Sequence, residues 1–142
     1  MTIQSVDVLY TAVATAENGR DGRVATDDGK IDVVVNTPKE LGGSGVGTNP
    51  EQLFAAGYSA CFQSALGIVA RQAGADITNS LVTARVGIGS TAEGGFGIAV
   101  QLLVSIPSLD DATATDLVNK AHQVCPYSNA TRGNISVELV VV

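Results

Sequence analysis

The amino-acid sequence predicts an α+β fold built on antiparallel sheet. Two segments carry the signals of helices, one around Cys61 and one that ends at Cys125. Runs of alternating apolar and polar residues, which are typical of strands, lie before, between and after these helices. Strands grouped in this way favour hairpins, and therefore an α+β class rather than a parallel sheet with alternating helices.

The first part of the chain predicts a three-stranded antiparallel meander. Residues 6–16 alternate loosely, residues 23–26 suit a short strand, and residues 31–35 are mostly β-branched. Glycine-containing turns at residues 18–22 and 28–29 separate the three strands, and Arg20 is held inside the first turn.

A glycine-rich loop and a long helix are expected next. Pro38 and four closely spaced glycines oppose regular structure over residues 37–48. These glycines do not match a phosphate-binding loop, because Thr48 stands where the GxGxxG pattern needs its third glycine. Asn49 is a good N-cap and Pro50 suits the first helical position, so the helix is expected to begin here and to end at Gly74.

The second half predicts a hairpin, a second helix and a last strand. Residues 81–89 and 96–106 alternate apolar and polar side chains around a Gly-Gly turn. Ser108 and Asp111 resemble a capping box for a helix over residues 109–124, which Pro126 is expected to end. A final strand is expected over residues 134–142.

Length and composition indicate one domain that spans residues 1–142 and associates with itself. Apolar residues make up 45% of the 142 residues and charged residues only 15%. A monomer of this size hides so much apolar surface with difficulty, which favours a homo-oligomer. The net charge of −6 argues against a nucleic-acid partner, because binding phosphate requires a basic patch.

The first helix raises the question of a membrane span. Residues 53–70 carry no charge, but they include Ser59, Gln63 and Ser64, so a buried core helix is the better interpretation. The N-terminal residues lack the basic and apolar regions of a signal peptide, and a cytoplasmic location is therefore expected.

Two cysteines are the candidates for chemistry. Cys61 lies in the middle of an apolar helix, where burial raises the pKa of a thiol, so it becomes a nucleophile only if a cation reaches it. Arg20, between glycines, is one candidate for that cation. No CxxC or HxxxH spacing supports a metal site.

Two other readings of the cysteines stay open on spacing alone. In the first, both thiols are inert in a non-catalytic α+β dimer that binds a small molecule. In the second, Cys125 and His122 form the nucleophile and base of a hydrolase, with Asn129 or Asn134 orienting the histidine.

Six sequence stretches resemble one known family over essentially the whole chain. They are VLYTA at 8–12, NGRDG at 18–22, ELGG at 40–43, NPEQLFAAGYSACF at 49–62, RVGIG at 85–89 and AHQVCPYSNATRGNI at 121–135. Together they are similar to the organic hydroperoxide resistance (Ohr) branch of the Ohr/OsmC family. The CPYSNATRGN stretch favours Ohr over OsmC.

The resemblance implies an OsmC-like fold, with antiparallel sheets wrapped around two central helices in an intertwined dimer. It implies a thiol peroxidase without a metal or organic cofactor that reduces alkyl and fatty-acid hydroperoxides. Cys61 would be the peroxidatic cysteine, Cys125 the resolving cysteine, Arg20 the group that activates Cys61, and Glu51 the partner that orients Arg20. The implied reductant is a dihydrolipoyl group on a lipoylated protein.

Helix geometry adds two expectations. Glu51 and Cys61 are ten residues apart, which is about 15 Å along a straight helix, so Arg20 and Glu51 are expected to face the Cys61 of a second subunit. An internal disulfide requires the second helix to approach the first near Cys61.

The apolar side chains of Phe54, Phe62 and Leu66 are expected to suit the organic tail of a substrate.

Overall fold

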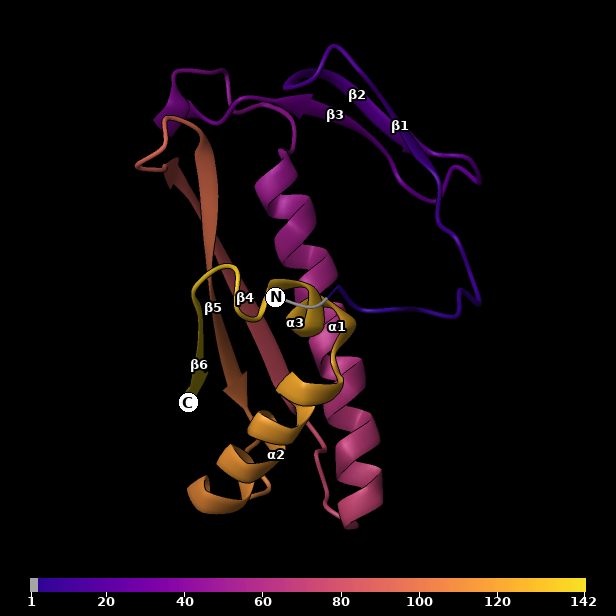
Figure 1. Cartoon of the computed structure of the whole chain (residues 1–142), viewed down its shortest axis with the longest axis vertical. Coiled ribbons are helices and arrows are strands. Elements are labelled where there is room, and N and C mark those ends of the chain that lie inside the picture. Colours follow the sequence, from indigo (N-terminus) through magenta and orange to yellow (C-terminus); the bar gives the residue numbers. More distant parts are fainter. Residues whose placement is uncertain (1–2) are drawn as a thin grey trace. The chain divides into compact units, whose positions relative to one another are not determined.

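The computed structural model describes residues 3–142 and confirms the α+β class. The elements fall into two compact units, of which the first ends at Pro50 and the second comprises Glu51–Val142 (Figure 1). The single domain expected from chain length stays a prediction. The first unit holds one three-stranded sheet, and the second holds the long helix, the second sheet and both cysteines.

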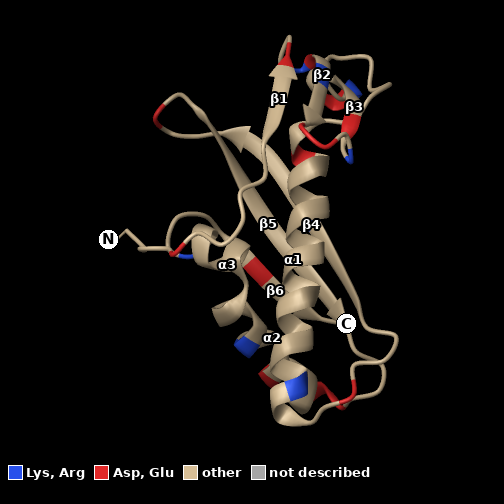
Figure 2. Cartoon of the chain, turned by 90° about the vertical axis from the view of Figure 1, so that its right-hand side faces the viewer, with Lys and Arg blue, Asp and Glu red and all other residues tan. Residues whose placement is uncertain are grey.

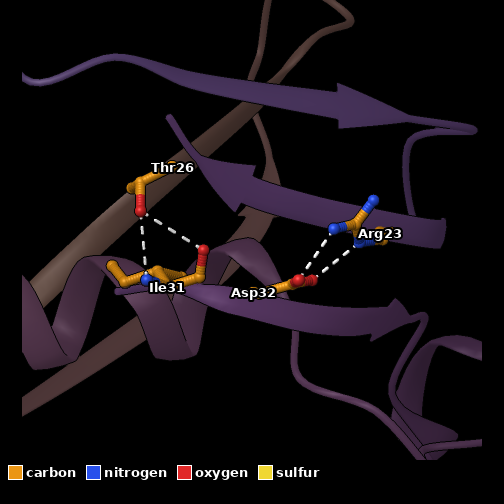
Figure 3. Close-up of polar contacts among 4 residues, drawn as sticks. All are labelled: Arg23, Thr26, Ile31 and Asp32. Atoms are coloured by element: carbon orange, nitrogen blue, oxygen red, sulfur yellow. Dashed lines mark hydrogen bonds and ion pairs between the residues drawn. The ribbon is translucent and has the colours of Figure 1, made fainter. Parts of the chain in front are cut away.

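The sheet of the first unit is the predicted antiparallel meander, in the order β1 (Ala14–Glu17), β2 (Asp21–Thr26) and β3 (Asp32–Asn36). Arg23 on β2 makes a two-pronged ion pair with Asp32 on β3, at 2.6 and 2.7 Å (Figure 3). At the hairpin end, the Thr26 hydroxyl accepts a hydrogen bond from the Ile31 N–H at 3.0 Å. Both contacts are largely exposed, so they contribute little to the stability of the sheet, although they agree with its strand register.

The strand predicted over residues 6–16 is wrong for most of its length. Only Ala14–Glu17 forms a strand, and residues 3–13 have no strand or helix assignment. The alternating side chains of Val6, Val8 and Tyr10 are exposed. An apolar alternation becomes a strand only where a neighbouring backbone supplies hydrogen bonds, and β2 supplies them only from Ala14 onward.

The predicted loop returns to β3 before the long helix begins. It contains one short 3-10 helix, η1 (Lys39–Leu41), and then forms a bridge in which the Thr48 N–H donates to the Val34 carbonyl at 2.9 Å. A side chain at Gly47 would lie 2.5 Å from the same carbonyl oxygen, so glycine is required there.

The long helix α1 (Pro50–Ala73) is unbroken and ends, as predicted, at Gly74, which has a φ of +65°. One face lies in the core, and its buried side chains recur at helical spacing: Tyr58, Phe62, Ala65, Leu66, Val69 and Ala70. Figure 2 shows charged residues only near the ends of α1. By length and composition α1 is apolar enough to cross a membrane, but its buried face agrees with the predicted core helix.

The second sheet consists of β4 (Leu81–Ser90), β5 (Phe96–Ser105) and β6 (Val137–Val141). Apolar residues form rows across the three strands on the face toward the core: Val86–Val100–Val137, Ala84–Leu102–Leu139 and Val82–Val104–Val141. The predicted β4–β5 hairpin is confirmed. The expectation of purely antiparallel sheet is wrong here, because β6 pairs with β5 in parallel.

The parallel pairing follows from the chain between β5 and β6. A parallel neighbour requires a long crossover, which here contains the helices α2 (Asp111–Val124) and α3 (Pro126–Thr131). Sequence alternation identifies a strand and its apolar face, but it does not reveal the direction in which that strand pairs.

Two details of the crossover differ from the sequence prediction. Asp110, rather than Ser108, caps α2, because its carboxylate accepts the Thr113 N–H at 2.8 Å, while Ser108 bonds the Asp76 carbonyl. Pro126 does end α2, but it also begins α3. Proline opposes helical backbone at the residue before it, and its own φ suits the first position of a new helix.

The short helix α3 lies beside the middle of α1 (Figures 1 and 2). Gly57 permits this close approach, because a Cβ at this position would lie 2.6 Å from the hydroxyl oxygen of Tyr127. The ring of Tyr127 packs on Phe54 and Tyr58, with ring centroids 5.7 and 5.5 Å away.

This contact predicts that Gly57→Ala destabilises the protein by about 1–3 kcal/mol, although alanine is the better helix former. In a Tyr127→Phe background the hydroxyl is gone and the nearest ring atom is 3.2 Å away, so the same substitution should cost much less. Urea unfolding of the four proteins at one concentration measures the coupling. Equal costs in both backgrounds would contradict the packing argument.

Candidate active site

The two cysteines lie together, as the sequence analysis expected. Cys61 projects from the middle of α1, and Cys125 occupies the junction between α2 and α3. Their sulfur atoms are 3.7 Å apart and both thiols are free. A disulfide bond is about 2.0 Å long, so a small movement of one sulfur atom would join them.

The two thiols differ in access to solvent. Cys125 is completely buried, with 0% of its surface exposed, whereas Cys61 is only half-buried. A molecule arriving from solution therefore meets Cys61 before Cys125.

The environment of Cys61 within this chain disfavours the thiolate, as predicted. Burial raises the pKa of the Cys61 thiol above its ordinary value, and neighbouring Cys125 adds to this effect. A hydrogen bond from the backbone of Tyr127 acts in the opposite direction and lowers the pKa. The net shift is upward, so a reactive Cys61 requires an additional positive group.

Backbone hydrogen bonds fix the turn between α2 and α3. The Cys125 N–H donates to the Ala121 carbonyl, and the Cys125 carbonyl accepts from the Asn129 N–H, both at 2.9 Å. Arg132, just after α3, donates to the His122 carbonyl in the last turn of α2. The guanidinium thus supplies a partner and a positive charge at the C-terminal end of α2.

A buried hydroxyl cluster joins α1 to α3, and the sequence analysis missed it. The Tyr58 hydroxyl lies 2.8 Å from the Ser128 hydroxyl and 3.1 Å from the Thr131 hydroxyl. Tyr58 precedes Cys61 by three residues on one face of α1, and Ser128 follows Cys125, the N-cap of α3, by three. The equal spacing of a hydroxyl residue from each cysteine was the sequence signal that could have predicted this cluster.

An apolar pocket of about 420 Å³ lies beside α3. Its lining includes Phe54, Ile98, Tyr127 and Ile135, with Thr131 and Asn134 as polar groups. Phe54 lies seven residues before Cys61 on α1 and therefore on the same helix face. The pocket is large enough to hold part of an organic ligand.

The expectation that Phe62 and Leu66 contact a substrate tail is wrong. Both side chains are fully buried in the core and face the interior of the second unit. Of the three apolar residues predicted for this role, Phe54 lines the pocket beside α3. The sequence could not separate them, because all three are apolar residues of one helix and only the packing decides which are covered.

The hydrolase arrangement is not supported. His122 precedes Cys125 on α2, but its Nδ1 atom is buried and has no hydrogen-bond partner among residues 3–142. Neither Asn129 nor Asn134 therefore orients the ring through that atom, as a nucleophile–base pair would require. Burial lowers the pKa of His122, and the nearby positive charge of Arg132 lowers it further.

Arg20 and Glu51 occupy the local settings that the sequence predicted. Arg20 is half-buried in the β1–β2 turn, where Asn18 and Gly19 have φ values of 56° and 55°. Gly22 is obligatory in this turn, because a Cβ there would lie 1.8 Å from the Glu17 carbonyl oxygen. Arg20 belongs to the first unit and the cysteines to the second, so its approach to Cys61 stays a prediction.

Glu51 lies in the first turn of α1. Because α1 is continuous, Glu51 and Cys61 are separated by about 15 Å along the helix axis. The carboxylate therefore does not reach the thiol on its own helix, and the expected role of Glu51 also stays a prediction.

Comparison with solved structures shows close likenesses of fold. A crystal structure of a putative organic hydroperoxide resistance protein from Vibrio cholerae, with captopril bound in one of the active sites, has a TM-score of 0.92 and 50% identity; the match covers 97% of this chain and 95% of that one. The crystal structure of OhrB from Bacillus subtilis has a TM-score of 0.87 and 45% identity. That match covers 95% of this chain and 100% of the OhrB chain.

Comparison of sequences identifies the family. The chain is 54% identical over 136 residues to the organic hydroperoxide resistance protein of Xanthomonas axonopodis pv. citri, which covers 94% of this chain and 95% of that protein. Residues 42–140 match the family model described as OsmC-like protein. These matches, on a fold with the two cysteines in contact, show that the chain belongs to the Ohr/OsmC family.

Proposed function

We propose that this protein is a thiol peroxidase that reduces organic hydroperoxides to alcohols. The observation that carries the proposal is the contact between a half-buried thiol and a buried thiol, with 3.7 Å between Cys61 Sγ and Cys125 Sγ. The relatives at 54% and 45% identity are named organic hydroperoxide resistance proteins, which supports a role in detoxifying such peroxides.

In the first step the Cys61 thiolate attacks the terminal, hydrogen-bearing oxygen of the hydroperoxide, and the O–O bond breaks as the S–O bond forms. The new S–O bond leaves a sulfenic acid on Cys61, and the departing alkoxide takes a proton to become the alcohol. The sulfur is oxidised by two electrons and the peroxide is reduced by the same two electrons. A cation beside Cys61 would stabilise both the thiolate and the charge that develops on the departing oxygen.

In the second step the Cys125 thiol attacks the sulfenic sulfur of Cys61. The S–S bond forms, the S–O bond breaks, and the hydroxyl leaves as water with the thiol proton. The short distance between the two sulfur atoms supports this step, and burial of Cys125 protects it from direct reaction with the peroxide.

A dithiol then restores the enzyme by two exchange reactions, in which the reductant becomes a cyclic disulfide and both cysteines become thiols. Following the family resemblance, we assign this role to a dihydrolipoyl group on a lipoylated protein. A cytoplasmic location fits the two free thiols, because that compartment keeps cysteines reduced.

The apolar pocket beside α3 supports a preference for organic hydroperoxides over hydrogen peroxide. Alkyl or fatty-acyl tails would bury against Phe54, Tyr127 and Ile135, whereas hydrogen peroxide has no tail to contribute binding energy. The same pocket is compatible with the non-catalytic small-molecule-binding alternative, which the first experiment below separates from the peroxidase.

In this proposal, the cation that activates Cys61 comes from a second copy of the chain. Glu51 and Cys61 lie far apart on one unbroken helix, and large apolar side chains such as Leu9 and Phe96 are 98% and 81% exposed. Exposed apolar surface of this kind marks an interface. In the proposed homodimer, Arg20 and Glu51 of one subunit complete the site around the partner subunit's Cys61.

The peroxidase chemistry predicts that a stoichiometric amount of cumene hydroperoxide removes both free thiols of the reduced protein. Thiol titration with a chromogenic disulfide measures this loss, and dihydrolipoamide should restore the thiols. Cys61→Ser should abolish turnover, whereas Cys125→Ser should stop at the sulfenic acid. Unchanged thiols would support the non-catalytic binding protein. A hydrolytic activity that survives Cys61→Ser but is lost in His122→Ala would support the hydrolase.

The shared site predicts that two inactive variants restore each other. Cys61→Ser and Arg20→Ala homodimers should each be inactive, but subunits unfolded and refolded together should form heterodimers with one intact site. The control is a mixture of Cys61→Ser with Cys125→Ser, which stays inactive because both cysteines belong to one subunit. If the first mixture also stays inactive, Arg20 acts within its own chain or not at all.

The cation also predicts a change in the pH profile of Cys61. Because burial and Cys125 raise the pKa of Cys61 more than the Tyr127 backbone lowers it, the partner's Arg20 is expected to lower it in the dimer, and Arg20→Met should return it to a value above the ordinary one. In a Cys125→Ser background, alkylation by iodoacetamide at neutral pH should then slow by about tenfold for each unit of pKa gained. Arg71→Met, at the far end of α1, is the matched control. An identical midpoint in the Arg20 variant would refute the role of Arg20.

A further inference from the structure

We propose that Tyr58 is a positioning residue for closure of the disulfide, and that its buried hydroxyl holds Cys125 within reach of oxidised Cys61. The inference rests on the proposed peroxidase function and adds a residue to its second step. It concerns the reaction of the Cys61 sulfenic acid with the Cys125 thiol, which forms the S–S bond and releases water.

The placement of Tyr58 carries the first part of the argument. On α1, Tyr58 comes three residues before Cys61, and in the α3 segment Ser128 comes three residues after Cys125. Tyr58 and Cys61 therefore share a face of α1, and Ser128 lies in the first turn of α3, whose N-cap is Cys125. The 2.8 Å hydroxyl contact of Tyr58 with Ser128 therefore joins the same two segments that bring the two sulfur atoms to 3.7 Å.

Burial of the cluster carries the second part. Tyr58 and Ser128 are both 0% exposed and Thr131 is 6% exposed. The Thr131 hydroxyl also donates a hydrogen bond to the Tyr127 carbonyl at 2.9 Å. The backbone of Tyr127 in turn hydrogen-bonds Cys61, so Tyr127 links the cluster to the thiol. A phenylalanine would fill the same apolar space, and the hydroxyl is therefore the specific contribution of tyrosine at this position.

The consequence concerns freedom of movement. The α1 helix is fixed by its buried face in the core, whereas α3 is a helix of six residues. The hydroxyl of Tyr58 ties α3, whose N-cap is Cys125, to the helix that bears Cys61. Without it, Ser128 and Thr131 lose their common partner, α3 gains freedom to rotate, and Cys125 spends less time at the distance from which it attacks.

The test is Tyr58→Phe, followed through the two steps separately. Sulfenic acid formation is measured by rapid trapping with a dimedone reagent after one equivalent of cumene hydroperoxide, and disulfide closure is measured by the loss of the Cys125 thiol. We expect closure to slow by about tenfold more than peroxide attack, with a corresponding accumulation of trapped sulfenic acid.

Two further variants separate positioning from loss of stability. Thr131→Val removes one hydroxyl at nearly constant volume and should slow closure in the same direction. Val104→Ala, which truncates a buried side chain on β5, should lower the free energy of unfolding while leaving the ratio of the two rates as in the wild type.

Each outcome bears on the proposal. If Tyr58→Phe and Thr131→Val close the disulfide as fast as the wild type, or if Val104→Ala shifts the ratio equally, the positioning role is refuted. Failure of the wild type to form any sulfenic acid would instead refute the peroxidase function itself. Accumulated sulfenic acid in Tyr58→Phe, reversed when the tyrosine is restored, would support the inference.

Discussion

The contact between α3 and the middle of α1 is the constraint on which the candidate site depends. Gly57 removes the side chain that would keep Tyr127 away, and Tyr58 provides the hydroxyl that Ser128 and Thr131 share. Cys61 lies one turn further along α1, and Cys125 begins the segment that leads into α3. Packing of two helices thus places two sulfur atoms, distant in sequence, 3.7 Å apart.

The same apolar surroundings create a conflict that the chemistry must resolve. In the proposed function, the charge-free middle of α1 and a pocket lined by Phe54 and Tyr127 favour an organic substrate. Burial, however, raises the pKa of Cys61 and so disfavours the thiolate that would attack this substrate. A cation delivered from outside the cysteine-bearing unit reconciles the two requirements. In the proposed function this cation is Arg20, which lies on a turn where Gly22 is obligatory.

Much of the fold could be predicted from local sequence signals. The caps and apolar content of residues 49–74 indicated α1 with its ends, and the alternation on either side of Gly94-Gly95 indicated the β4–β5 hairpin. Other elements depended on partners distant in sequence. The apolar alternation of residues 6–13 formed no strand, β6 paired in parallel, and Pro126 began a helix as well as ending one.

The sequence by itself determined the family, the helix that bears Cys61 and the two thiols as the candidates for chemistry. These follow from motifs, spacing and caps, which act over a few residues. Only the tertiary structure decided that Cys125 is buried beside Cys61, that Phe54 rather than Phe62 lines a pocket, and that Tyr58 joins the two segments. Such contacts depend on how elements pack across long separations, where apolar residues of one helix become distinguishable only by what covers them.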